Sequence, residues 1–181
     1  SKFNVRINQA LVYDGRFRYD IGNEPEKYGV FDPNHVAIDK FQCNISLKQF
    51  SPENIRLNIR SISGKEKSGL EIIRLCANVE SEAGQTRLKR FEFILPGSTI
   101  TSDILDIYYD PSNPAALSLQ GELKGERISP ADFAPIFPKM ANGTPAISLN
   151  IKGRADSTIA EGYIDIQTHN NSFIFKGNCA I

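Results

Sequence analysis

The stretch Ile55-Arg56-Leu57-Asn58-Ile59-Arg60 decides the fold class. Apolar and polar residues alternate strictly in it, which is the pattern of a β-strand with one apolar face and one face turned to water. An amphipathic helix would instead place its apolar residues three and four positions apart. The chain therefore contains at least one long, half-buried strand.

The same alternation recurs on both sides of this stretch. Where the alternation slips by one residue, every following side chain changes face, and such slips near Ile72-Ile73 and near Ile104-Leu105 predict β-bulges that bend the strands. Further strands are expected at residues 3–8, 17–21, 41–48, 70–80, 86–95, 99–109, 115–125, 146–155, 158–167 and 172–181.

Only one segment favours a helix. Ser129 is suited to an N-cap, Pro130 to the first helical position and Asp132 to the first turn. Pro135 and Pro138 then limit the segment to one or two turns. We therefore predict an all-β fold, an elongated and curved antiparallel β-sheet shaped as a trough, with one short helix near residues 130–136. A compact β-sandwich is the alternative, because it also consists of short strands and turns.

A weak internal repeat accompanies the strands. The segment 116–125 is similar in pattern to the segment 146–153, at a spacing of about 30 residues that is typical of stacked strand units. The loops expected at 22–29 and 110–114 are too short to be domain linkers. Residues 1–181 are therefore predicted to form a single all-β segment.

Composition excludes several classes of function. Lys+Arg and Asp+Glu both number 21, so the basic excess of a nucleic-acid-binding protein is missing. No run approaches the roughly 20 apolar residues that cross a bilayer. The first residue is Ser, and the last residues still have a strand pattern. We therefore expect a segment of a longer protein.

No pattern of reactive residues points to catalysis. His35 and His169 have no partners at metal-ligand spacing, and no serine has the context of a nucleophile elbow. Cys43 and Cys76 lie in apolar strand patterns, where they are either small buried side chains or a disulfide pair. The sequence predicts no enzyme, no metal site and no cofactor.

The apolar strand faces are then the candidate functional surface. They are either ordinary core or the lining of an open groove that binds acyl chains, since burying each CH₂ group contributes about 0.8 kcal/mol. The candidate lipid-binding residues share one parity on three strands: Ile55, Leu57, Ile59, Leu117, Leu119, Ile147, Leu149 and Ile151.

Several segments together resemble one protein family. They are Phe17-Arg18-Tyr19-Asp20, the stretch from Gly29 to Val36, the stretch from Lys65 to Glu71, and the stretch from Ile128 to Pro138, followed by the strand at 147–153. In order and spacing they are similar to segments of TamB-like proteins, the inner-membrane subunits of the translocation and assembly module, which are related to AsmA-like proteins.

The resemblance implies a periplasmic location and a non-enzymatic function. Members of the family are long proteins of Gram-negative bacteria, tethered to the inner membrane by an N-terminal helix that this chain lacks. Their strands form a trough with an apolar interior. The implied function is outer-membrane biogenesis by conduction of phospholipid, with acyl chains as the ligand and an outer-membrane assembly protein as the partner of other parts of the full-length chain. The alternative is a scaffold for outer-membrane proteins that acts by strand addition.

Overall fold

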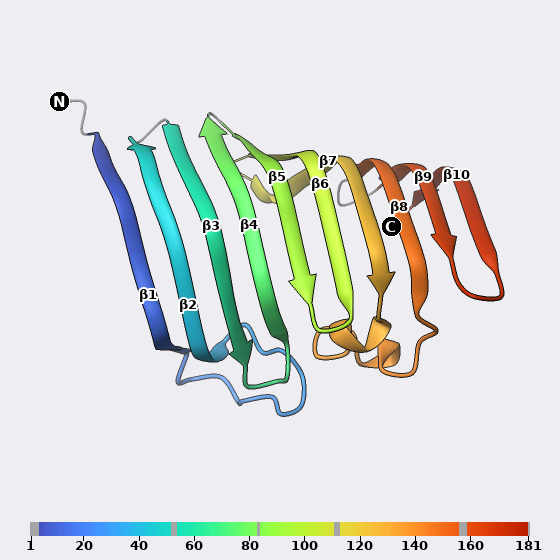
Figure 1. The fold of residues 1–181 in the computed structure, drawn as a ribbon, viewed down its shortest axis with the longest axis horizontal. Coiled ribbons are helices and arrows are strands. Elements are labelled where there is room, and N and C mark those ends of the chain that lie inside the picture. Colours follow the sequence, from blue (N-terminus) through green and yellow to red (C-terminus); the bar gives the residue numbers. More distant parts are fainter. Residues whose placement is uncertain (1–3, 52–53, 83, 111–112, 156–158, 181) are drawn as a thin grey trace.

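The computed structural model describes residues 4–51, 54–82, 84–110, 113–155 and 159–180. These residues form one ten-stranded antiparallel sheet in which the strands lie side by side in chain order (Figure 1). The strands are β1 (Val5–Asp20), β2 (His35–Phe50), β3 (Asn54–Glu66), β4 (Glu71–Glu82), β5 (Gln85–Leu95), β6 (Ser98–Asp110), β7 (Asn113–Ile128), β8 (Ala146–Ala155), β9 (Ile159–Gln167) and β10 (Ser172–Ala180).

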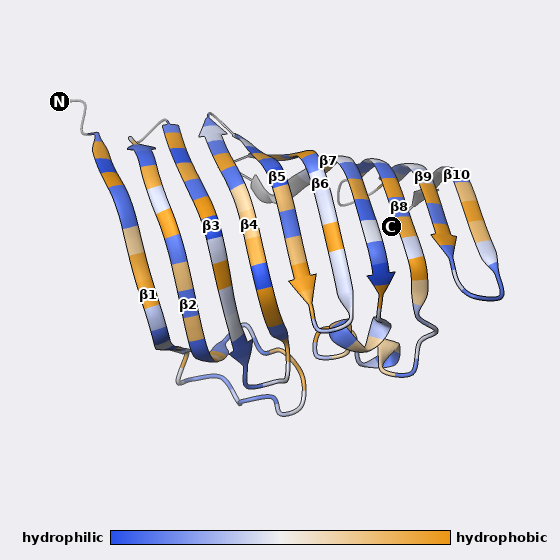
Figure 2. Cartoon of the chain, viewed as in Figure 1, coloured by the Kyte–Doolittle hydropathy of each residue, from blue (hydrophilic) through white to orange (hydrophobic). Residues whose placement is uncertain are grey.

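The prediction of an all-β, elongated and curved sheet is confirmed, and the alternative of a sandwich is wrong. All ten strands belong to the same sheet, so the described residues contain no second sheet. Hydrophilic and hydrophobic residues alternate along most strands (Figure 2). Nine strand spacings of about 4.8 Å give the sheet a length of roughly 43 Å across its strands.

β-Bulges bend the strands. Both predicted bulges are present: the β3–β4 register shifts between Ile62 and Gly64, opposite residues 72–75, and the β6–β7 register shifts between Thr101 and Leu105. Four non-glycine strand residues adopt positive φ, the backbone conformation that bulges use: Asp14, Lys40, Arg90 and Arg127.

A row of glycines creases the C-terminal half of the sheet. Gly121, Gly153, Gly162 and Gly177 are direct partners across β7, β8, β9 and β10. The backbones of β8 and β9 approach so closely here that a Cβ on Gly153 would lie 2.9 Å from the Gly162 Cα and closer still to the Glu161 carbonyl oxygen. Strand glycines commonly mark a sharp bend or a close backbone approach.

Two sequence-based expectations differ from the structure. The strands expected at 3–8 and 17–21 are not separate: residues 5–8 and 17–20 are parts of the single strand β1, because bulges interrupt the alternation without ending the pairing with β2. Residue 3 lies outside the described residues. In place of the helix predicted near 130–136 there is a short 3₁₀-helix, Pro130–Phe133, and a second 3₁₀-helix, Pro138–Met140, follows beyond the predicted range. Ser129 makes no side-chain cap, and its backbone N–H donates instead to the Ser98 Oγ at 2.9 Å.

The β1–β2 loop is held at the end of the strands by a buried carboxylate. Asp32 is 1% exposed, and its carboxylate accepts the backbone N–H groups of Lys27 at 2.9 Å and Asn34 at 3.1 Å. The His35 ring lies between two carboxylates, with Nδ1 3.0 Å from Asp32 and Nε2 3.1 Å from Asp20.

Acid is expected to weaken this loop through Asp32. The hydrogen bond from the Lys27 N–H, aided by those from Asn34 and His35, lowers the pKa of Asp32 from 3.8 to about 2. The ionised carboxylate therefore stabilises the fold above pH 3.8, and this stabilisation is lost as the pH falls from 3.8 toward 2.

Urea unfolding of the wild type and of Asp32→Asn tests this dependence, since comparing the two proteins isolates one carboxylate among many. The wild type should unfold at a higher urea concentration at about pH 6, and the two midpoints should converge near pH 2. A difference that is the same at both pH values would contradict the prediction.

Candidate functional site

One face of the sheet is apolar from the first strand to the last. A single row of direct cross-strand partners crosses all ten strands, and it contains apolar side chains and one glycine: Val12, Cys43, Ile62, Leu75, Phe93, Ile100, Gly125, Leu149, Ile166 and Phe173. Such cross-strand neighbours lie about 5 Å apart and contact one another. We call this surface the apolar face.

The structure brings the predicted lipid-binding residues together on this face. Leu57 on β3, Gly121 on β7 and Gly153 on β8 belong to one row of direct cross-strand partners, which passes through β4, β5 and β6 and therefore lies on a single face. Along their own strands these positions share parity with the other candidates, namely Ile55 and Ile59 on β3, Leu117 and Leu119 on β7, and Ile147, Leu149 and Ile151 on β8. The side chain of Leu117 lies outside the described part of the chain.

The apolar face is not a conventional core. Leu119 is 40% exposed and Ile147 45%, while Ile55, Leu57, Ile59, Leu149 and Ile151 are half-buried. The fully buried apolar side chains of the described residues are Ala77, Leu95 and Ala146. These side chains are therefore shielded from water only by adjacent side chains of the same sheet, and no second sheet of the described residues covers them.

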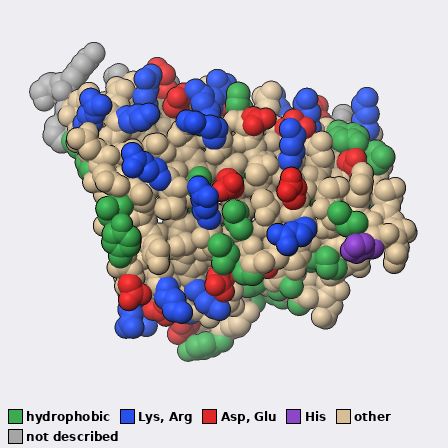
Figure 3. All heavy atoms as spheres, viewed as in Figure 1, with side chains coloured by type: hydrophobic (Ala, Val, Ile, Leu, Met, Phe, Trp, Pro, Cys, Tyr) green, Lys and Arg blue, Asp and Glu red, His purple; other side chains and the backbone are tan. Residues whose placement is uncertain are grey.

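The opposite face is polar and carries both signs of charge. Figure 3 shows Lys, Arg, Asp and Glu side chains spread over the face turned to the viewer. One row of partners places charges of alternating sign on successive strands, with the neutral Gln120 between Asp106 and Arg154: Arg56, Glu80, Arg87, Asp106, Gln120, Arg154 and Glu161. The Arg87 guanidinium donates two hydrogen bonds to Asp106, at 2.7 and 3.0 Å, and lowers the pKa of that carboxyl.

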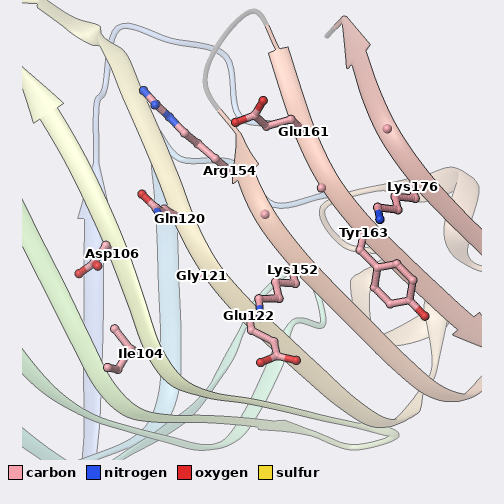
Figure 4. Close-up of a pocket in the computed structure, with 13 residues that line it drawn as sticks. Ile104, Asp106, Gln120, Gly121, Glu122, Lys152, Arg154, Glu161, Tyr163 and Lys176 are labelled. Atoms are coloured by element: carbon pink, nitrogen blue, oxygen red, sulfur yellow. The ribbon is translucent and has the colours of Figure 1, made fainter.

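A shallow hollow of about 820 Å³ lies on this polar face at the glycine crease (Figure 4). Its charged side chains are three cations, Lys152, Arg154 and Lys176, and three carboxylates, Asp106, Glu122 and Glu161. Lys152 is the direct cross-strand partner of Glu122, and Arg154 is that of Glu161. Because opposite charges are adjacent, the hollow has no excess of either sign to select a charged ligand.

On the apolar face the same crease leaves a cavity of about 190 Å³. Its apolar walls are formed by side chains of β6 to β10: Leu105, Leu119, Leu123, Ile151, Ile164 and Phe175. Sequence reasoning selected Leu119 and Ile151 but missed the others and missed the crease. The sequence signal for the crease was a glycine within each of the four strands β7 to β10. These glycines are cross-strand partners, so one row of the sheet has no side chains.

Cys43 and Cys76 are separate free thiols. Cys43 belongs to the apolar face, and burial raises the pKa of its thiol. Cys76 pairs with Glu92 on the polar face, and its Sγ lies 3.0 Å from the Arg60 carbonyl oxygen. The possible Cys43–Cys76 disulfide is therefore wrong, because the two side chains point to opposite sides of the sheet.

The described residues contain neither a metal-binding cluster nor a helix suited to span a membrane. Within them, no group of three or more His, Cys, Asp or Glu side chains is arranged to hold a metal ion. In the same part of the chain, no helix has the length and apolar content for a membrane span.

Comparison with known proteins finds no relative. No protein-family model, no curated protein and no solved structure matches the chain.

Proposed function

We propose that this chain is a segment of a TamB-like, AsmA-related periplasmic protein and that its apolar face conducts phospholipid between the inner and outer membranes. The observation that carries the proposal is an apolar face that crosses ten strands and that no second sheet of the described residues covers. Large exposed apolar surfaces usually mark sites that bind a lipid, a ligand or a protein. The resemblance of the motifs at residues 17–155 supports the choice of family.

The dimensions of the apolar face suit acyl chains. A bilayer core about 30 Å thick holds two chains end to end, so each chain spans roughly 15 Å. The apolar face is roughly 43 Å long, about three times that length. A lipid bound at one end would therefore have to travel to reach the other end, and each CH₂ group against the face contributes about 0.8 kcal/mol. The headgroup would stay in water beside the sheet.

Photo-crosslinking in the full-length protein tests the proposal. A photoreactive residue in place of Leu57, Leu119 or Leu149 should form lipid adducts, because these side chains belong to the apolar face. The same residue in place of Arg56 or Asn150, which belong to the polar face, should form none. Equal labelling of both faces, or no labelling, would contradict the proposal.

Strand addition is the second candidate function, and the edge strand β1 favours it. β1 is 16 residues long, contains no proline and pairs on one side only. It exposes large side chains, including Tyr13 at 74%. Unpaired edges with exposed apolar side chains accept strands from other proteins. Crosslinks from Tyr13 to a client protein, without lipid adducts at Leu119, would favour the scaffold over the conduit.

A further inference from the structure

A small cavity opens on the apolar face beneath the β1–β2 loop. Its volume is about 280 Å³, and Phe31 of the loop forms one wall. Its other apolar walls come from β2, β3, β4 and the β3–β4 turn: Val36, Ile38, Phe41, Ile62, Leu70 and Ile72. We call it the lid cavity, and residues 22–34 the lid.

The charged group at the lid cavity already has partners. Glu66 is the one charged side chain among the residues that line it. Its carboxylate accepts the backbone N–H groups of Ala37 at 3.1 Å and Ser68 at 2.7 Å. The carboxylate is therefore satisfied within the protein, and the cavity presents an apolar surface to an occupant.

The lid is attached at several points and is preformed over the cavity. The Phe31 N–H donates to the Pro135 carbonyl oxygen at 2.6 Å, which ties the lid to the β7–β8 loop. Asp32 and His35 fasten its C-terminal end, and Glu26 forms an ion pair with Lys67 in the β3–β4 turn. A preformed pocket binds without the cost of ordering a loop.

We propose that the lid cavity holds the methyl end of a single fatty acyl chain, a proposal that rests on the lipid-binding function proposed for the apolar face. An apolar cavity of about 150 Å³ stays dry and accepts a six-carbon ring, so a cavity of nearly twice that volume has room for a longer hydrocarbon segment. Because the lid forms one wall, the cavity lacks the flat surface that a bilayer would need and the open strand edge that a protein strand would need. Ile62 lines the cavity and also belongs to the row that crosses the whole apolar face, so the rest of the chain can lie on that face.

Tryptophan fluorescence tests the proposal, because the chain contains no tryptophan. Phe31→Trp places a reporter in the lid, and Phe173→Trp places one at the far end of the apolar face. Each protein is incubated with vesicles of phosphatidylcholine that carries bromine either at the methyl end or near the carboxyl end of its acyl chains. The protein is then separated from the vesicles, and quenching by the lipid that it retains is measured.

The expected result is selective quenching in the lid. Each CH₂ group buried in the lid cavity favours the bound state about fourfold, so the apolar methyl end should occupy the cavity in preference to the carboxyl end. Methyl-end bromine should therefore quench Phe31→Trp at least about fourfold more than carboxyl-end bromine. Phe173→Trp should respond similarly to both lipids. Quenching of Phe173→Trp alone, or quenching of Phe31→Trp that is equal for both lipids, would overturn the lid-cavity proposal and leave the proposed function standing. Quenching of neither protein would overturn both.

A cavity-filling variant provides the control. In the Phe31→Trp protein, Ile62→Phe should reduce methyl-end quenching at least about twofold, because the larger side chain occupies the cavity. Ile104→Phe is the matched change on the polar face, and it should leave quenching unchanged. If Ile62→Phe does not fold, as judged by circular dichroism, Val36→Phe fills the same cavity from β2. Undiminished quenching in a folded cavity-filling variant would contradict the proposal.

Discussion

Gly153→Ala is expected to destabilise the protein by about 1 to 3 kcal/mol, the range for forcing an extra group into a packed site. The new Cβ would lie 2.9 Å from the Gly162 Cα and closer still to the carbonyl oxygen of Glu161, both on the neighbouring strand β9. Both obstacles are backbone atoms, so a side-chain rotation cannot relieve the clash. The β8–β9 pairing would have to shift, and the bend that shapes the cavity at the crease would change with it.

Equilibrium unfolding in urea measures the effect, and Gly22→Ala is the matched control. A Cβ on Gly22 meets no heavy atom within 4 Å. Its free energy of unfolding should therefore stay within about 0.5 kcal/mol of the wild-type value. If Gly153→Ala and Gly22→Ala unfolded at the same urea concentration, the close approach of β8 and β9 would be refuted.

Leu119→Asp is expected to reduce lipid labelling at Leu149 more than about tenfold, while the protein remains folded. An ionised carboxylate placed against an acyl chain loses hydration, which costs several kcal/mol, and each 1.4 kcal/mol is a factor of about ten in binding. The fold should tolerate the change because Leu119 is 40% exposed, so the carboxylate reaches water when no lipid is bound.

Gln120→Asp is the control for this substitution. It adds the same charge at the next position of β7, where the side chain belongs to the polar face and pairs with Asp106 on β6 and Arg154 on β8. Crosslinking yield at Leu149 should be unchanged in Gln120→Asp, and circular dichroism should show folded protein in both variants. An equal loss of labelling in the two variants would argue against a path along the apolar face.

The sequence by itself determined the strands and their faces. A period of two residues follows from backbone geometry alone, so the stretch from Ile55 to Arg60 predicted which side chains share a face before any partner strand was known. The same logic located the bulges near Ile72 and Ile104, because a slip in period has one local cause. It also grouped Leu57, Leu119 and Ile151, which the structure places on one face.

Only the tertiary structure decided what covers that face and how the sheet bends. An alternating strand has the same pattern in a sandwich and in an open trough, because the pattern records one apolar side and not what lies against it. The glycine crease depends on four residues far apart in sequence whose positions coincide only through pairing register. The lid cavity likewise depends on a long-range contact, between Phe31 and Pro135, for which neither segment alone carries a signal. Local periodicity is a property of each strand, whereas register and covering are properties of the assembled sheet.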